Sequence, residues 1–226
     1  MTTYSLPFSR MNDQAYKWAA TLALITIIYN IAEGILSVAA GVAVESMSLF
    51  GFGLDSFVEV ISGIGIWHMV RRIRRNGGES PDPFEKTALK VTGTAFYVLT
   101  AGLAATALVD LYRDHKPENT FWGIIVAVIS IASMWLLIRA KVKVGAELSS
   151  PAILADAACT RACMQLSIVL LAASGGYQLT GIGGLDSVGA LVIGGLCFRE
   201  GREAFGKART GAYACTCGGS CKEGLE

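Results

Sequence analysis

Two acidic residues stand one helical turn apart in an apolar stretch of the sequence. Asp55 and Glu59 are separated by three residues within 46–70, a segment whose other residues include no Asp, Glu, Lys or Arg. In a helix this spacing puts both carboxylates on one face. Two carboxylates so close repel each other unless something neutralises them. The pair therefore predicts a bound metal ion, a shared proton or a basic partner.

Two cysteines have the same spacing in a second apolar stretch. Cys159 and Cys163 share a stripe with Asp156 in the helix expected at 151–175, while Arg161 points away from it. The rise of a helix puts these thiols and the two acids at similar depth, so the two pairs can face each other. Carboxylates and thiolates together bind zinc, and thiolates favour Cd(II), Cu(I) and Zn(II) over Mg(II) or Ca(II).

Two structural alternatives compete with a metal site. Cysteine is a small residue that is readily buried, and small residues at this spacing let helices approach closely. In the second alternative, Arg161 neutralises one acid and the other stays protonated, as in a structural ion pair.

The composition places these residues in a membrane. Of 226 residues, 53% are hydrophobic and 16% are charged, and the mean hydropathy is +0.50, which excludes a soluble enzyme. Residues 91–109, 119–138 and 162–185 contain no Asp, Glu, Lys or Arg, and each segment is long enough to cross a bilayer as a helix. A net charge of +1 without a basic, aromatic-rich face gives no sign of a nucleic-acid partner.

We predict an all-α membrane protein with six transmembrane helices. They are expected at 16–40, 46–70, 86–112, 119–140, 151–175 and 185–198. Ser150 and Pro151 suit a helix start, and Gly175 and Gly176 suit the end of the same helix. The expected organisation is a cytoplasmic N-terminal segment at 1–15, a six-helix transmembrane domain at 16–205 and a short cysteine-containing cytoplasmic tail at 206–226. The N-terminus has no signal-peptide pattern, so the first helix is expected to be retained.

Basic residues are distributed unequally between the two sides of the expected helices. Sixteen Lys and Arg residues fall on the side of both termini, whereas two fall on the other side and Arg161 lies within a helix. Cytoplasmic loops carry the excess of basic residues, so both termini are predicted to be cytoplasmic. The sixteen are Arg10, Lys17, Arg71, Arg72, Arg74, Arg75, Lys86, Lys90, Arg139, Lys141, Lys143, Arg199, Arg202, Lys207, Arg209 and Lys222, and the two are Arg113 and Lys116.

The motifs resemble those of the cation diffusion facilitators, a family of divalent-metal efflux transporters with six membrane helices. The run from Ser46 to Glu59 is similar to the family's Ser-Leu, five-residue gap, Asp-Ser-x-x-Asp pattern, and the run from Ala155 to Cys163 is similar to Ala-Asp-Ala-x-His-x-Arg-Ser-Asp. The resemblance extends over about residues 15–205 and includes Asn30-x2-Glu33 and Leu185-Asp186.

The resemblance implies a ligand set but also shows departures from the family pattern. The family's four ligands fall on Asp55, Glu59, Cys159 and Cys163, so that Glu replaces an Asp and two Cys replace His and Asp. These changes make a softer site. We expect this protein to be a variant that lacks the family's usual cytoplasmic domain of about 80 residues after the sixth helix. Further positions that resemble the family are expected to support the ligands or line the pathway; they are Asn30, Glu33, Asp156 and Asp186, with Arg161 as a longer-range partner.

From these patterns we expect a transporter and not an enzyme. The hypothesis is efflux of a soft or borderline metal ion from the cytoplasm, with zinc as the expected ion and Cd(II) or Cu(I) as alternatives, and with no other cofactor. Thiols lose protons when they bind metal, so the same ligands predict metal/proton antiport. The resemblance implies a homodimer, and the cytoplasmic membrane is the expected location.

Four further cysteines lie outside the predicted ligand set. Cys215, Cys217 and Cys221 have a spacing that can capture a soft ion and deliver it to the cytoplasmic mouth, although an unstructured tail is the alternative. Cys197 is interpreted as a packing residue. The rival functions are a membrane thiol oxidoreductase and a non-transporting metal-binding sensor or partner subunit.

Overall fold

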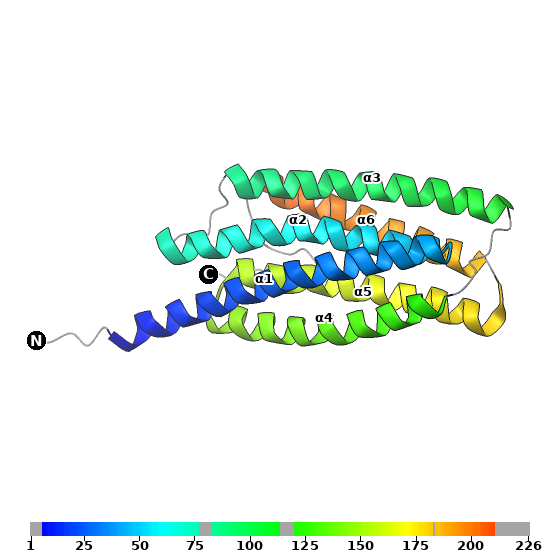
Figure 1. Cartoon of the computed structure of the whole chain (residues 1–226). Helices are drawn as coiled ribbons and strands as arrows, with labels where there is room; N and C mark the ends of the chain where they lie inside the picture. Colours follow the sequence, from blue (N-terminus) through cyan, green and yellow to red (C-terminus); the bar gives the residue numbers. More distant parts are fainter. Residues whose placement is uncertain (1–5, 77–82, 114–119, 183, 211–226) are drawn as a thin grey trace, which may run out of the picture.

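The computed structural model is a bundle of six long helices (Figure 1). It describes residues 6–76, 83–113, 120–182 and 184–210, and no strand occurs among them. Successive helices run in opposite directions, so α1 begins and α6 ends at the same end of the bundle. The helices are α1 (Leu6–Ala43), α2 (Met47–Asn76), α3 (Pro83–Arg113), α4 (Phe121–Glu147), α5 (Pro151–Thr180) and α6 (Gly184–Thr210).

Five of these helices are long and apolar enough to cross a membrane. The spans are Gln14–Ala43, Met47–Arg75, Leu89–Tyr112, Phe121–Glu147 and Cys159–Thr180. Large apolar side chains such as Leu36 and Val98 stay exposed on the outside of the bundle, as lipid contact requires. α6 carries charged residues in its second half, and it packs along α3 within the bundle (Figure 1). The prediction of an all-α, six-helix membrane protein is confirmed.

The helices extend further than hydropathy alone predicts. α1 begins before residue 16 and α6 continues past residue 205, so both expected domain boundaries fall inside helices. α4 continues to Glu147, and Lys141 and Lys143 therefore lie in this helix and not in a loop. Hydropathy marks the segment that crosses hydrocarbon, whereas backbone hydrogen bonding can carry a helix beyond it.

The predicted end of α5 is wrong, whereas its predicted start is right for one of the two reasons given. α5 passes through Gly175 and Gly176 and ends at Thr180, where Gly181 adopts a φ of 68°. In an apolar environment a helix keeps its backbone hydrogen bonds, which overrides the low helix propensity of glycine. At the start, Pro151 occupies the first helical position, but Ser150 makes no side-chain capping hydrogen bond.

Helices α1 and α2 approach each other very closely. A Cβ atom added to Gly53 would lie 2.7 Å from the backbone nitrogen of Val38, and one added to Gly41 would lie 2.6 Å from that of Phe50. Only glycine permits such a distance between two backbones. The close approach brings the polar residues of α1 next to the acids of α2.

Helix α2 also packs into the centre of the bundle. Leu49 and Phe52 are fully buried in one apolar cluster with Leu166 and Leu170 of α5 and Ile193 of α6. These contacts lie on the same side of α2 as Asp55, which is 1% exposed. The core therefore fixes the first acid of α2 between α5 and α6.

The N-terminus of α2 is held by an acid of α6. Asp186 accepts hydrogen bonds from the backbone N–H of Met47 at 2.7 Å and from the hydroxyl of Ser46 at 2.6 Å, and also from the Ser48 hydroxyl. A carboxylate at this position satisfies orphan amide hydrogens and interacts favourably with the helix dipole. The Ser46 and Asp186 positions of the motif therefore join α2 to α6.

Candidate metal centre

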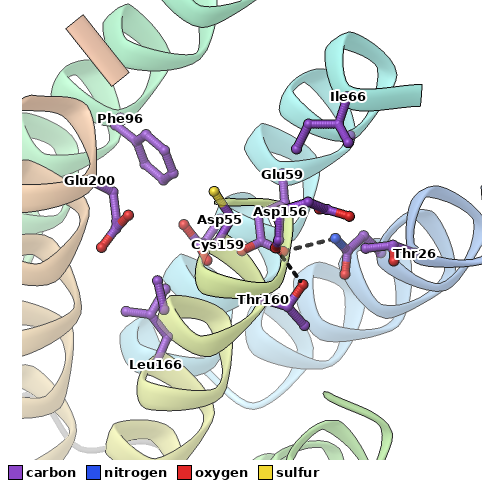
Figure 2. A pocket seen from close by; sticks show the side chains of 13 residues that line it. Thr26, Asp55, Glu59, Ile66, Phe96, Asp156, Cys159, Thr160, Leu166 and Glu200 are labelled. Carbon is purple, nitrogen blue, oxygen red and sulfur yellow. Dashed lines mark hydrogen bonds between the residues drawn. The ribbon is translucent and has the colours of Figure 1, made fainter. Parts of the chain in front are cut away.

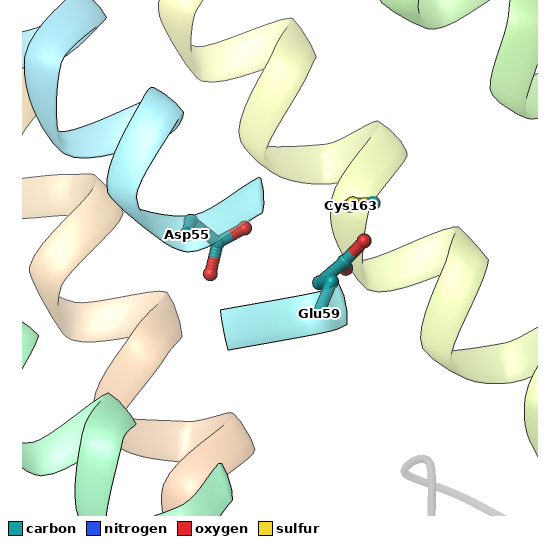
Figure 3. A group of neighbouring side chains, drawn as sticks. All are labelled: Asp55, Glu59 and Cys163. Carbon is teal, nitrogen blue, oxygen red and sulfur yellow. The ribbon is translucent and has the colours of Figure 1, made fainter. Parts of the chain in front are cut away.

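Three predicted ligands come together at the interface of α2 and α5. A carboxylate oxygen of Asp55, a carboxylate oxygen of Glu59 and the Sγ atom of Cys163 all lie within 4.8 Å of one another (Figure 3). Asp55 and Cys163 are buried and Glu59 is half-buried. The helical spacing of the two acids puts them on one face, and the cysteine lies on the facing side of α5. We refer to these three residues as the α2–α5 cluster.

Cys159 lies beside this cluster but is not part of it. It lines a cavity of about 50 Å³ that also borders Asp55 and Glu59 (Figure 2). Its Sγ atom accepts a hydrogen bond from Lys207 Nζ at 3.9 Å. The structure therefore unites three of the four expected ligands directly and places the fourth on the wall of the same cavity, one helical turn away.

Residues of α1 orient the acids of α2. The side-chain amide of Asn30 donates a hydrogen bond to Glu59 Oε2 at 2.8 Å. Glu33 accepts hydrogen bonds from the Tyr29 hydroxyl at 2.8 Å and from the Ser56 hydroxyl at 3.1 Å. Asn30 thus contacts a candidate ligand directly, whereas Glu33 is held in a separate network beside it. The structure thus places both residues beside the acids of α2, and their role as supporting residues stays a prediction.

Asp156 forms a buried ion pair that the sequence reasoning missed. Lys141 Nζ lies 2.8 Å from Asp156 Oδ1 and donates a second hydrogen bond to the Thr160 hydroxyl at 2.9 Å. Lys141 is 1% exposed. Positive-inside counting assigns this lysine to a loop. A helix continued to residue 147 would have put Lys141 four residues from Leu137 and Gly145, on the buried stripe of α4.

Arg161 occupies the exposed side of α5. The basic side chains nearest the acids and thiols come instead from α4 and α6, as Lys141 and Lys207. Among the described residues, no salt bridge or hydrogen bond joins Asp55 or Glu59 to a basic side chain. The two acids of the α2–α5 cluster therefore lack a bonded protein cation.

Cys197 contacts an acid of the α2–α5 cluster, although the sequence suggests only a packing role for it. It is fully buried, and its thiol donates to Asp55 Oδ1 at 3.6 Å. The signal that locates it is the buried stripe of α6, where Ala190, Ile193, Cys197 and Gly201 recur every three or four residues. A single cysteine in an apolar helix gives no other indication of such a contact.

The donor set fits a metal cation as cargo. Asp55 Oδ2 is buried and has no hydrogen-bond partner among the residues that the structure describes. A buried carboxylate oxygen without a partner is costly, and a bound cation would satisfy it. Carboxylate and thiolate ligands suit a four-coordinate zinc ion, and the thiolate shifts the preference toward soft ions. The cysteines Cys215, Cys217 and Cys221 lie outside the described residues.

The six-helix membrane bundle has buried acids and a thiol on facing helices, which are donor groups that a membrane transporter of metal cations needs. Residues 23–209 match the family model described as the cation efflux transmembrane domain, and the chain belongs to this family. No individually curated protein matches the sequence. The match covers all the predicted ligand residues within the membrane domain and agrees with the resemblance seen in the motifs.

Proposed function

We propose that the protein exports Zn(II)-like or Cd(II)-like ions from the cytoplasm in exchange for protons. Family membership establishes metal-cation transport, and the choice of a soft or borderline ion is supported by Cys163 within 4.8 Å of both acids of α2. This thiol stands where the resembling family pattern has Asp. Replacing a hard oxygen donor by sulfur favours zinc, cadmium or Cu(I) over magnesium, calcium or manganese.

Proton exchange follows from the chemistry of the same donors. A thiol must lose its proton before it binds a metal ion, so metal binding releases protons at the α2–α5 cluster. Protons that enter from the outside would compete for the same carboxylates and thiol. Alternating access of this cluster to the two membrane sides then couples proton entry to metal exit.

The four predicted ligands are proposed to bind the ion by movement of side chains on α5. Cys159 lies on the cavity wall and Cys163 lies within the cluster, so an ion that enters the cavity meets Cys159 beside Asp55 and Glu59 before it reaches Cys163. The tail cysteines are proposed to capture the ion and deliver it to this cavity. The orientation with cytoplasmic termini, the cytoplasmic membrane as location and a homodimer are further parts of the proposal.

Flux and binding measured on one purified sample test the proposal. With a proton gradient imposed across the proteoliposome membrane, the native protein should carry Zn(II) or Cd(II) in the direction opposite to the proton flow. In detergent it should bind the ion stoichiometrically. The double variant Cys159→Ser/Cys163→Ser should lose most of this flux, whereas Cys215→Ser/Cys217→Ser/Cys221→Ser serves as a matched cysteine control with maximal flux retained.

One outcome of this experiment would overturn the ligand assignment, and two would favour other functions. Native flux in the Cys159→Ser/Cys163→Ser variant would overturn the assignment of these ligands. Stoichiometric binding without flux would support a sensor or partner subunit. Neither binding nor flux, together with reversible thiol oxidation, would support a membrane thiol oxidoreductase.

A further inference from the structure

Helix α6 places a thiol against Asp55 and a carboxylate on the wall of the cavity that Asp55 also borders. Cys197 is fully buried and its Sγ atom lies 3.6 Å from Asp55 Oδ1. The four ligands of the family pattern lie on α2 and α5, so this contact adds a third helix to the site. Asp55 therefore has a thiol neighbour on α5 and another on α6.

A carboxylate follows Cys197 at the spacing that keeps it on the same face. Glu200 is three residues further along α6, its side chain is 14% exposed, and it lines the cavity that also borders Asp55 and Cys159. Figure 2 shows Glu200 on the α6 side of this cavity. Glu200 Oε1 lies 3.2 Å from the guanidinium of Arg199, which is mostly exposed, so this pair is accessible to water and is weak.

The two carboxylate oxygens of Asp55 have different surroundings. Asp55 Oδ1 accepts the thiol of Cys197, whereas Oδ2 is buried with no hydrogen-bond partner among the described residues. A carboxylate that contacts one thiol through Oδ1 and keeps Oδ2 without a partner has an oxygen left to bind a metal ion. No basic side chain bonds to Asp55 or Cys197 in the described part of the chain.

We propose that Asp55 and Cys197, together with Glu200 from the wall of the same cavity, form a second subsite for a thiophilic divalent cation, with Asp55 shared between this subsite and the α2–α5 cluster. The donor atoms of these three residues do not all lie within 4.8 Å of one another, so ion binding requires the Glu200 side chain to turn toward Asp55. The inference rests on the proposed function, because it deepens the description of the same pathway. An ion that exchanges Cys197 and Glu200 for Glu59 and Cys163 stays bound to Asp55 throughout. Such stepwise exchange avoids a bare ion in a low-dielectric interior.

Cadmium binding to the full-length chain in detergent tests the subsite. The tail variant Cys215→Ser/Cys217→Ser/Cys221→Ser is used as background, so that sulfur ligands come from the membrane domain. In this background Glu59→Gln/Cys163→Ser removes the α2–α5 donors except Asp55. Cd(II) should still bind, with the ultraviolet charge-transfer absorption of a cadmium–thiolate bond. Adding Cys197→Ser should abolish that absorption and weaken Cd(II) binding by about tenfold or more.

A matched cysteine control identifies the sulfur. Cys159→Ser, added in place of Cys197→Ser, should leave the cadmium–thiolate absorption, and an absorption that follows Cys159 would overturn the subsite. Gel filtration and the helical circular dichroism of each variant check the fold. If the background protein binds Cd(II) but Glu59→Gln/Cys163→Ser shows no thiolate-bound Cd(II), the α6 subsite is overturned and the proposed function still stands. If the native chain binds no Cd(II) or Zn(II), the proposed function fails first.

Discussion

The bundle contains two buried groups of ionisable side chains that are built in opposite ways. Between α4 and α5, the ammonium of Lys141 is bonded to Asp156 at 2.8 Å and to Thr160 at 2.9 Å. Between α2 and α5, Asp55 and Glu59 lie within 4.8 Å of each other and of a thiol, with no bonded protein cation among the described residues. The first group neutralises itself, whereas the second requires protons or a cation from outside the protein.

We expect this difference to separate an acid that stabilises the fold from an acid that takes part in transport. Both groups face the same cavity through Asp156 and Asp55, so burial alone does not separate them. Bonded partners do. Removal of a charge should therefore damage stability in the Lys141–Asp156 pair and transport in the α2–α5 cluster.

The largest expected effect on transport is that of Asp55→Asn. The amide cannot supply a negative ligand, and Asp55 belongs to both the cluster and the α6 subsite, so metal flux in proteoliposomes should fall by about 100-fold or more. Thermal unfolding of the metal-free protein in detergent should not become easier, because the substitution removes a buried carboxylate oxygen without a partner. A metal-free variant that is clearly less stable than the native protein would contradict the comparison.

The largest expected effect on stability is that of Lys141→Met. Loss of the ammonium leaves Asp156 buried without its cation, at a cost of about 3–5 kcal/mol. The double variant Lys141→Met/Asp156→Leu removes both charges and should recover most of that loss. Unfolding of each variant is measured in detergent by circular dichroism or a thermal-shift assay. Equal stability of the single variant and the native protein would show that the pair is not structural.

A smaller effect is expected from Asn30→Ala. This change removes the donor that binds Glu59 Oε2 at 2.8 Å and leaves the carboxylate free to rotate. Substitutions of residues that orient a metal ligand reduce metal affinity by about 10–100-fold. Titration with Zn(II) or Cd(II) in detergent checks the result, with Thr26→Ala, another cavity-lining residue of α1, as control. Similar affinities of the two variants would argue against an orienting role.

The smallest effect is expected from Asp186→Asn. The amide keeps one acceptor oxygen for the donors of α2, but the second acceptor oxygen and the charge that interacts with the helix dipole are lost. The expected destabilisation is about 1 kcal/mol, measured by thermal unfolding. Zn(II) affinity should stay close to the native value, since Asp186 lies at the end of the bundle away from the cavity. A loss of affinity as large as that of Asn30→Ala would make Asp186 part of the metal pathway.

The sequence predicts the arrangement of helices better than it predicts the charged contacts between them. The α2–α5 cluster follows from i, i+4 spacing on two helices of predicted depth, and all three of its members could be named without a structure. Lys141 could not be assigned, because the end of α4 is set by backbone hydrogen bonding beyond the apolar segment. Cys197 could not be assigned either, because a lone cysteine has no spacing partner and its contact with Asp55 depends on how α6 rotates against α2.

The close packing of the helices in pairs gives the α2–α5 cluster a mechanical property. α1 packs most extensively with α2, α3 with α6 and α4 with α5, so Asp55 and Glu59 belong to one hairpin and Cys163 to another. Metal–oxygen and metal–sulfur bonds to zinc are about 2.0–2.3 Å long and tolerate little variation. If the α2–α5 cluster binds the ion as proposed, a slide of one hairpin past the other by about an ångström or two would release it, and ion binding would depend on the relative position of the two hairpins.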